Sequence, residues 1–118
     1  MKLIIGGRSQ GKLEYAKKAY GVSLIAEGSE CTADEMAEAE CINNLQDYIR
    51  KNNTGAECEL PGLREDAVVI CDEVGCGIVP LSEEERDYRE AVGRVCIRLA
   101  ERAESVERIF CGIPVRIK

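Results

Sequence analysis

The chain has 118 residues, of which 45% are hydrophobic and 32% charged, a composition typical of one globular domain. Lysine and arginine total 16 against 22 aspartate and glutamate, and the net charge of −6 argues against a binder of duplex nucleic acid. No residue is histidine, which excludes zinc proteases, Ser-His-Asp hydrolases and Cys-His catalysis.

The first part of the chain predicts a strand, a helix and a second strand. Residues 2–5 (Lys-Leu-Ile-Ile) predict a short buried strand, and the glycines that follow it indicate a tight turn. A helix is expected over 10–20 and ends at Gly21, because glycine readily adopts the left-handed conformation that terminates helices. A second apolar run over 22–26 indicates another short strand.

The middle of the chain predicts one long helix followed by a loop. Thr32 and Glu35 have the spacing of a capping box, which marks the start of a helix. Apolar residues then recur at helical spacing, so the helix is expected to continue to Asn52. Residues 56–66 include a Pro-Gly pair and are expected to form a loop.

The last part of the chain completes an alternation of strands and helices. Residues 67–71 are a continuous apolar run, which is typical of a strand buried on both faces. A second capping box begins a helix expected over 82–103, and short strands are expected over 109–111 and 115–117. This order predicts an α/β fold, a mainly parallel sheet with helices on both faces, in one compact domain over 1–118.

The seven cysteines are spread along the chain, and none of them has C-x-x-C spacing. The redox and zinc motifs built on that spacing are therefore missing. The N-terminal apolar run over 3–5 is too short for a signal peptide or a membrane span. We expect a cytoplasmic protein with reduced, mostly buried cysteines, Cys76 in a glycine-rich loop being the exception.

Residues 6–12 fit the pattern G-x-x-x-x-G-K, directly after the first strand and at the start of the first helix. Glycines let the backbone N–H groups of such a loop turn toward phosphate oxygens, and the helix N-terminus adds a favourable dipole. The stretch predicts a phosphate-binding loop, and the alternative is a glycine-rich turn with a chance lysine. The predicted nucleotide-binding residues are Gly6, Gly7, Arg8, Ser9, Gln10, Gly11, Lys12 and Leu13, with Lys12 reaching the β and γ phosphates.

Leu13 is a departure from the phosphate-loop pattern. The position after the lysine normally holds serine or threonine, whose hydroxyl binds magnesium. Leucine cannot ligate a metal, so magnesium must be held by other groups and water, or nucleotide binding is weakened or repurposed. Ser9, within the loop, is a candidate substitute.

Asp72 and Glu73 directly follow the apolar run 67–71. A carboxylate at the end of a parallel strand, beside a phosphate loop, can hold magnesium directly or through water. We therefore expect Asp72 to hold the metal and Glu73 to accept a hydroxyl proton, with Lys12 as the third catalytic residue. The alternative is that both acids only cap the following turn.

Gly75, Cys76 and Gly77 form a loop next to these acids, where a substrate would lie. Arg94, on the helix that follows, is the nearest arginine and a candidate for a phosphate contact. These four residues are the predicted substrate-binding set.

Several segments together resemble the adenosylcobinamide kinase/adenosylcobinamide-phosphate guanylyltransferase family. They are Glu-Val-Gly-Cys-Gly-Ile-Val-Pro at 73–80, Gly-Arg-Val at 93–95, Arg-Leu-Ala at 98–100, Gly-Ile-Pro at 112–114, and the loop at 6–12. The octapeptide is specific to the family, whereas the phosphate loop alone points only to its superfamily. The resemblance covers about residues 1–20 and 67–118.

The resemblance implies a RecA-like P-loop NTPase fold and an enzyme of cobalamin assembly. Family members phosphorylate the hydroxyl of the cobinamide aminopropanol arm, then transfer GMP onto that phosphate, and they can assemble as trimers. On this basis we expect Mg²⁺, ATP or GTP as co-substrate, and a corrinoid-type small molecule as acceptor. No nucleic-acid or membrane partner is expected. The oligomeric state is left open, with a homo-oligomer as one possibility.

The family's second reaction runs through a guanylylated histidine, which this chain does not have. We therefore expect the kinase step without the guanylyltransferase step. The middle region is also shorter than the family's. The family has two strands before the glycine loop, one of which ends in an acidic residue. Here the single strand over 67–71 is expected to replace both, so that Asp72 takes over the metal-binding role of the acidic residue.

Three functions are open at this point. The first is a small nucleotide-dependent cobinamide kinase. The second is a catalytically weak nucleotide- or cobinamide-binding protein derived from that enzyme, which Leu13 and the shortened middle favour. The third is an unrelated phosphate-loop protein, which would make the match at 73–80 a coincidence.

Overall fold

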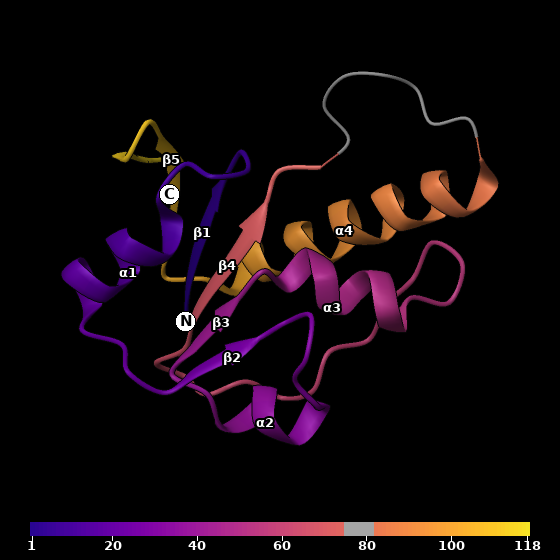
Figure 1. The fold of residues 1–118 in the computed structure, drawn as a ribbon, viewed down its shortest axis with the longest axis horizontal. Coiled ribbons are helices and arrows are strands. Elements are labelled where there is room, and N and C mark those ends of the chain that lie inside the picture. Colours follow the sequence, from indigo (N-terminus) through magenta and orange to yellow (C-terminus); the bar gives the residue numbers. More distant parts are fainter. Residues whose placement is uncertain (75–81) are drawn as a thin grey trace.

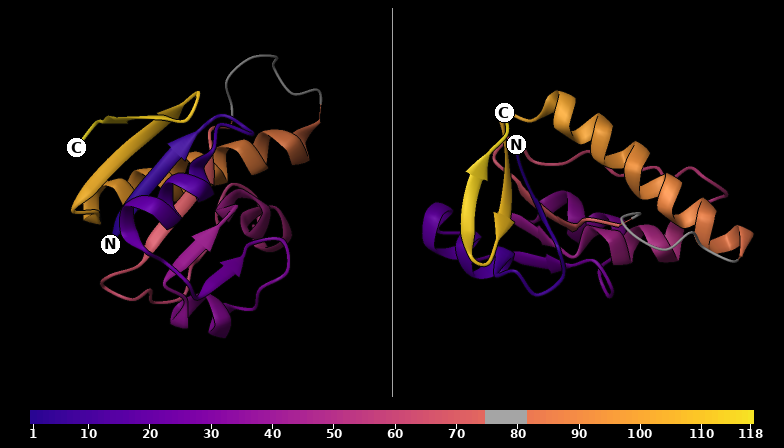
Figure 2. Two further views of the ribbon diagram at one scale, coloured as in Figure 1. Left: turned by 60° about the vertical axis from the view of Figure 1, so that its left-hand side comes forward. Right: turned by 90° about the horizontal axis from the view of Figure 1, so that it is seen from above.

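A six-stranded sheet organises the chain in the computed structural model, which describes residues 1–74 and 82–118 (Figure 1). Strands β1 to β5 pair in parallel, and only β6 is antiparallel to its neighbour β5. In spatial order the strands are β2 (Ile25–Glu27), β3 (Cys41–Asn43), β4 (Val68–Asp72), β1 (Lys2–Gly6), β5 (Ser105–Phe110) and β6 (Ile113–Arg116). The hairpin of β5 and β6, in yellow, stands at one edge of this sheet (Figure 2).

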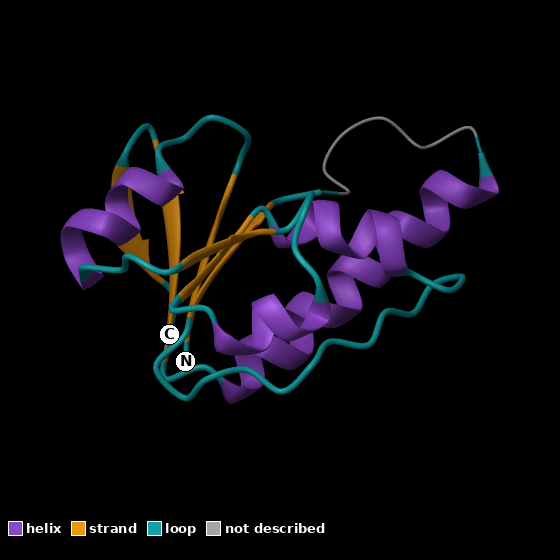
Figure 3. Cartoon of the chain, turned by 60° about the horizontal axis from the view of Figure 1, so that its bottom comes forward, coloured by secondary structure: helices purple, strands orange, loops and turns teal. Residues whose placement is uncertain are grey.

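Helices cover both faces of the sheet (Figure 3). On one face α1 (Lys12–Tyr20) packs against the strands, and on the other lie α2 (Ala33–Glu38), α3 (Leu45–Asn52) and α4 (Glu83–Arg102). The predicted α/β class, with a mainly parallel sheet and helices on both faces, is confirmed. No helix in the described parts of the chain is both long and apolar enough to cross a membrane.

The central strands β1 and β4 are apolar over residues 3–5 and 68–71 because both of their faces are buried there. Ile4 of β1 and Ile70 of β4 belong to the core beneath α1, whereas Leu3 and Val69 belong to the larger core beneath the other three helices. Side chains alternate between the two faces of a strand, so a strand with helices on both sides needs apolar residues at every position. The apolar runs of β1 and β4 were therefore predictable as strands from the sequence.

The long helix predicted over 32–52 is wrong. The capping box at Thr32 is present, but α2 ends at Glu38 and the chain then enters β3 before α3 begins. Ile42 of β3 lies opposite Val69 of β4 in the parallel register, and its side chain is fully buried. The pairing with β4 overrides the helical spacing of the apolar residues. β3 is thus a further strand beside β4 that the sequence-based prediction did not include.

The remaining differences are shifts of element boundaries. The strand predicted over 22–26 is the shorter β2, and the strand predicted over 109–111 begins four residues earlier, as β5. The final strand ends at Arg116 rather than at 117. Ser82 caps α4 as expected, accepting a hydrogen bond from the backbone N–H of Glu85 at 3.1 Å.

Gly28 holds the chain after β2 tightly against the end of β3. Its N–H donates to the carbonyl oxygen of Asn43 at 2.8 Å, and an added Cβ would lie 2.1 Å from the carbonyl oxygen of Asn44. We expect Gly28→Ala to lower the free energy of unfolding by about 1–3 kcal/mol, the usual cost of forced overpacking. Urea denaturation followed by circular dichroism measures this loss.

The control for Gly28→Ala is Gly93→Ala on α4, where an added Cβ would meet nothing within 4 Å. Alanine is the better helix former, so this change is expected to raise the free energy of unfolding by roughly 0.5–1 kcal/mol. Equal unfolding midpoints for the two variants would contradict the close approach at Gly28.

Candidate functional site

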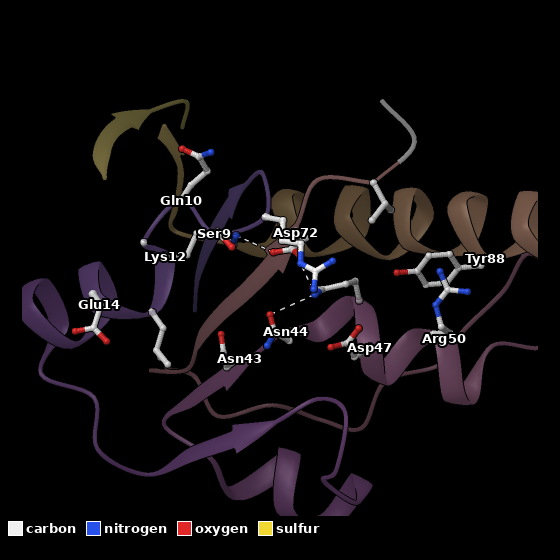
Figure 4. Close-up of a pocket in the computed structure, with 15 residues that line it drawn as sticks. Ser9, Gln10, Lys12, Glu14, Asn43, Asn44, Asp47, Arg50, Asp72 and Tyr88 are labelled. Carbon is white, nitrogen blue, oxygen red and sulfur yellow. Dashed lines mark hydrogen bonds and ion pairs between the residues drawn. The ribbon is translucent and has the colours of Figure 1, made fainter. Parts of the chain in front are cut away.

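The carboxyl ends of β1, β3 and β4 meet at one edge of the sheet and form the floor of a cavity of about 530 Å³. Ligands of open parallel sheets bind at this edge. The loop after β1 and the start of α1 supply its wall over residues 8–14, and Val74 lies beside the end of β4. The other lining residues are Asn43, Asn44, Gln46, Asp47, Arg50, Asp72 and Tyr88 (Figure 4).

The loop predicted to bind phosphate lies where the sequence places it, between β1 and α1. Gly11 caps the N-terminus of α1 with a φ of 84°, in the left-handed region that glycine adopts without strain. Ser9 also has a positive φ, 59°, and its side chain is exposed to the cavity. The loop therefore turns sharply twice before the helix begins.

Lys12 is the first residue of α1, and its side chain is only 6% exposed. Its ammonium group donates a hydrogen bond to the carbonyl oxygen of Gly7 at 2.7 Å and forms an ion pair with Asp72 Oδ1 at 2.7 Å. Asp72 ends β4, the strand beside β1. The fold thus brings together the lysine and the carboxylate that the sequence assigned to one site.

The tip of the loop is anchored by the turn between β5 and β6. The carbonyl oxygen of Gln10 accepts a hydrogen bond from the N–H of Gly112 at 3.0 Å, and its side-chain oxygen accepts another from the N–H of Cys111 at 2.6 Å. The side chain of Gln10 is therefore committed to this turn. A distant part of the chain, the turn at Cys111 and Gly112, therefore holds the loop in shape through Gln10.

A network of amides joins the ends of β3 and β4. Buried Gln46 accepts a hydrogen bond from the N–H of Asp72 at 2.9 Å and donates one to Asn44 Oδ1 at 3.3 Å. The carboxylate of Glu27 accepts hydrogen bonds from the side-chain amides of Asn43 and Asn44, both at 2.8 Å. Asp72 therefore owes its position partly to residues of β2, β3 and α3.

Sequence reasoning missed this second wall of the cavity. It assigned residues 32–52 to one helix, which gave Asn43, Asn44 and Gln46 no place beside a strand end. The signal that could have found them is Asn43-Asn44 directly after the apolar pair Cys41-Ile42. Asparagine tolerates the left-handed conformation and favours turns, and Asn44 has a φ of 53°.

The far end of the cavity is lined by an arginine stacked on a tyrosine. The guanidinium carbon of Arg50 lies 3.7 Å from the centre of the Tyr88 ring, and the same group forms a bidentate ion pair with Glu85 at 3.1 and 3.2 Å. The Arg50 hydrogen bonds lower the pKa of Glu85. Burial raises the pKa of the Tyr88 hydroxyl, and the charge of Asp47 acts in the same direction. The tyrosine is therefore neutral near pH 7.

Gly6 and Gly7, at the start of the loop, do not line the cavity, and neither do Glu73 and Arg94, which were predicted for catalysis and substrate binding. Glu73 forms an ion pair with Arg108 of β5, with contacts of 2.8 and 3.0 Å, and does not line the cavity. Arg94 pairs with Glu57 and, at 2.6 Å, with Glu90 on its own helix. The structure does not bring either side chain to Lys12, because Arg108 holds Glu73, and Glu57 and Glu90 hold Arg94. The predicted substrate residues Gly75, Cys76 and Gly77 lie outside the described residues.

The fold and the cavity define an α/β protein with a lysine and a carboxylate at the carboxyl edge of a parallel sheet. The family model described as cobinamide kinase / cobinamide phosphate guanyltransferase matches residues 28–117, more than half of the chain. The chain belongs to this family. The match includes the middle region, with β3 and α3, and begins after the loop over 6–12.

Curated relatives match shorter segments. Two bifunctional adenosylcobalamin biosynthesis proteins named CobU, from Salmonella typhimurium and Escherichia coli, are each 45% identical over 51 residues. That segment is 43% of this chain and 28% of either relative. The similarly described CobP of Pseudomonas aeruginosa is 38% identical over 64 residues, 52% of this chain and 35% of the relative. The match therefore spans only about a third of each relative's length.

Proposed function

We propose that this chain is a P-loop, RecA-like kinase that transfers the γ-phosphoryl group of ATP or GTP to the hydroxyl of adenosylcobinamide. The observation that carries the proposal is the contact between Lys12 and Asp72 within the cavity shared by the 6–12 loop. The order of the strands, with the loop after central β1, supports this fold class. Family membership supports the choice of acceptor.

In this proposal the loop binds the phosphates of the nucleotide. The backbone of residues 7–11 and the N-terminus of α1 would face the phosphate oxygens, where amide donors and the helix dipole favour negative charge. Lys12 would exchange its contact with Asp72 for the β and γ phosphates. Its burial supports such a role, because a buried ammonium group requires an anionic partner.

The residues of the cavity fit Mg²⁺ when the ion is bound together with a nucleotide. Magnesium commonly uses one or two carboxylates, substrate phosphates and water, and Asp72 supplies one carboxylate. Within the described parts of the chain, no three Cys, Asp or Glu side chains gather closely enough to hold a metal by themselves. When bound, magnesium neutralises charge on the β and γ phosphates. Asp72, and Ser9 in place of the hydroxyl missing at Leu13, are the residues that would hold it.

Restoring a hydroxyl at position 13 is expected to strengthen magnesium-dependent nucleotide binding. Leu13→Ser supplies the ligand that the loop lacks, and a gain of about threefold to tenfold in affinity corresponds to one modest metal contact. Titration with a fluorescent ATP analogue, with magnesium and with a chelator, measures the change. Leu13→Ala is the control, because it removes the same partly buried side chain without adding an oxygen. Equal magnesium dependence in both variants would contradict the metal position.

A phosphorylation assay tests the proposed function. Purified protein is incubated with magnesium, adenosylcobinamide and either ATP or GTP, and the product is analysed by mass spectrometry. The proposal predicts adenosylcobinamide phosphate and stoichiometric nucleoside diphosphate. No product with either nucleotide would overturn it.

A second candidate is a nucleotide- or cobinamide-binding protein with little catalysis. The hydroxyl missing at Leu13 favours it. Nucleotide-dependent thermal stabilisation without any phosphorylated product would support this candidate over the kinase, because a ligand that binds only the folded state raises its stability.

A further inference from the structure

A hydroxyl that attacks phosphorus must lose its proton, and this inference rests on the kinase function proposed above. A general base must lie within hydrogen-bond reach of that hydroxyl, so it must line the same cavity as Lys12. Three carboxylates line this cavity, those of Glu14, Asp47 and Asp72. Each must be compared by the contacts that it already makes.

Asp72 and Glu14 are poorly placed for proton transfer. Asp72 forms an ion pair with Lys12. In the proposed nucleotide complex its carboxylate would hold magnesium, so it is not available as a base. Glu14 lies on α1, an exposed position well away from Asp72 and Arg50 (Figure 4). Glu73, the base expected from the sequence, is held outside the cavity by Arg108.

Within the described parts of the chain, Asp47 differs from Asp72 and Glu73 in having no ion-pair partner. It differs from the exposed Glu14 in being partly buried. Among residues 1–74 and 82–118, no hydrogen bond or ion pair is made by its carboxylate. It lies in the first turn of α3, directly after Gln46, which holds the N–H of Asp72. In Figure 4 its side chain lies between Asn44 and Arg50, on the opposite side of the cavity from Lys12.

The surroundings of Asp47 leave it available for an incoming group. Arg50 is engaged by Glu85 and by the Tyr88 ring, so its charge is already neutralised by another carboxylate. Asn43 and Asn44 turn their amide N–H groups to Glu27 rather than to Asp47. Among the described residues, the wall opposite the phosphate loop thus presents the Asp47 carboxylate to a hydroxyl donor with no side-chain partner of its own.

We propose that Asp47 is the catalytic residue that accepts the proton of the acceptor hydroxyl. The hydroxyl oxygen forms a bond to the γ-phosphorus, and the bond from that phosphorus to the β–γ bridging oxygen breaks. The nucleoside diphosphate leaves with the electron pair of the broken bond. The hydroxyl proton passes to the Asp47 carboxylate and then to water.

Chemical rescue tests this assignment in the full chain with ATP, magnesium and adenosylcobinamide. Asp47→Asn and Asp47→Ala are expected to lower kcat by about 100-fold to 10,000-fold, the usual contribution of general base catalysis. Nucleotide affinity should be unchanged in both variants, which also shows that they are folded. Added formate should raise kcat of Asp47→Ala by about tenfold or more, because a free carboxylate replaces the missing base. Formate should not change kcat of the parent.

The matched control is Asp34→Asn, in the first turn of α2 and outside the cavity. It removes the same favourable charge from a helix N-terminus and should leave kcat unchanged. Parental kcat in Asp47→Asn, or a lowered kcat without rescue by formate, would overturn the role of Asp47 and leave the kinase proposal intact. A parent that transfers no phosphoryl group would overturn both.

Discussion

Lys12→Ala is expected to abolish both nucleotide binding and phosphoryl transfer. At a nucleotide concentration 100 times its dissociation constant, the parent should gain about 2.7 kcal/mol of stability, and the variant should gain none. Transfer should fall by at least about 100-fold, as it does when one preorganised donor to a transition-state oxygen is removed. The physical reason is that Lys12 is the buried cation of the cavity, held by the same loop that would surround the phosphates. Thermal unfolding with and without nucleotide measures the first effect.

Lys18→Ala is the matched control for this experiment. Lys18 lies on the same helix, and its side chain is exposed away from the cavity. Removing it changes the net charge by the same amount but leaves the loop intact. Parental stabilisation by nucleotide in Lys12→Ala would show that residues 6–12 are only a glycine-rich turn.

Asp72→Asn is expected to remove the magnesium dependence of nucleotide binding. In the parent, magnesium should tighten binding by about tenfold or more, which corresponds to the roughly 1.5–3 kcal/mol of a charged contact. In the variant this gain should be lost. Without magnesium, the variant should bind nucleotide more tightly than the parent does, because Lys12 no longer has Asp72 as a partner. Titrations with magnesium and with a chelator separate the two effects.

Asp66→Asn controls for the loss of an aspartate from an ion pair. Asp66 pairs with Arg64 at 2.8 Å and precedes the opposite end of β4. It should show the parental response to magnesium. The same response in Asp72→Asn would mean that Asp72 only positions Lys12 and does not hold a metal.

The parts of the site that were predictable are those that a local sequence pattern marks. The loop over 6–12 follows the apolar run 3–5 and Asp72 follows the apolar run 67–71, so a local pattern places both at the carboxyl edge of a sheet. Their meeting follows from the fold class, because β1 and β4 are neighbours in parallel register with Gly6 opposite Asp72.

The parts that were missed depend on pairing between distant segments. Ile42, Leu45 and Ile49 have helical spacing, yet Ile42 belongs to a strand because it pairs with Val69 of β4. A strand of only three residues has too little local pattern to compete with that spacing. Gln46 and Asp47 become site residues only once β3 exists.

The failure at Glu73 has the same cause. Its partner Arg108 belongs to β5, and β5 reaches the edge of β1 only after the chain has crossed the sheet with α4. The sequence around residue 73 does not predict that ion pair. Arg94 is likewise held by Glu57, from a loop far away in the chain.

The fate of labelled phosphate tests the central claim most directly. Two parallel reactions contain adenosylcobinamide, magnesium and GTP labelled either at the γ or at the α phosphorus. The account predicts that the acceptor gains label only from γ-labelled GTP, because this chain has no histidine to carry a guanylyl group. Label transferred from α-labelled GTP, or no transfer from either nucleotide, would contradict it.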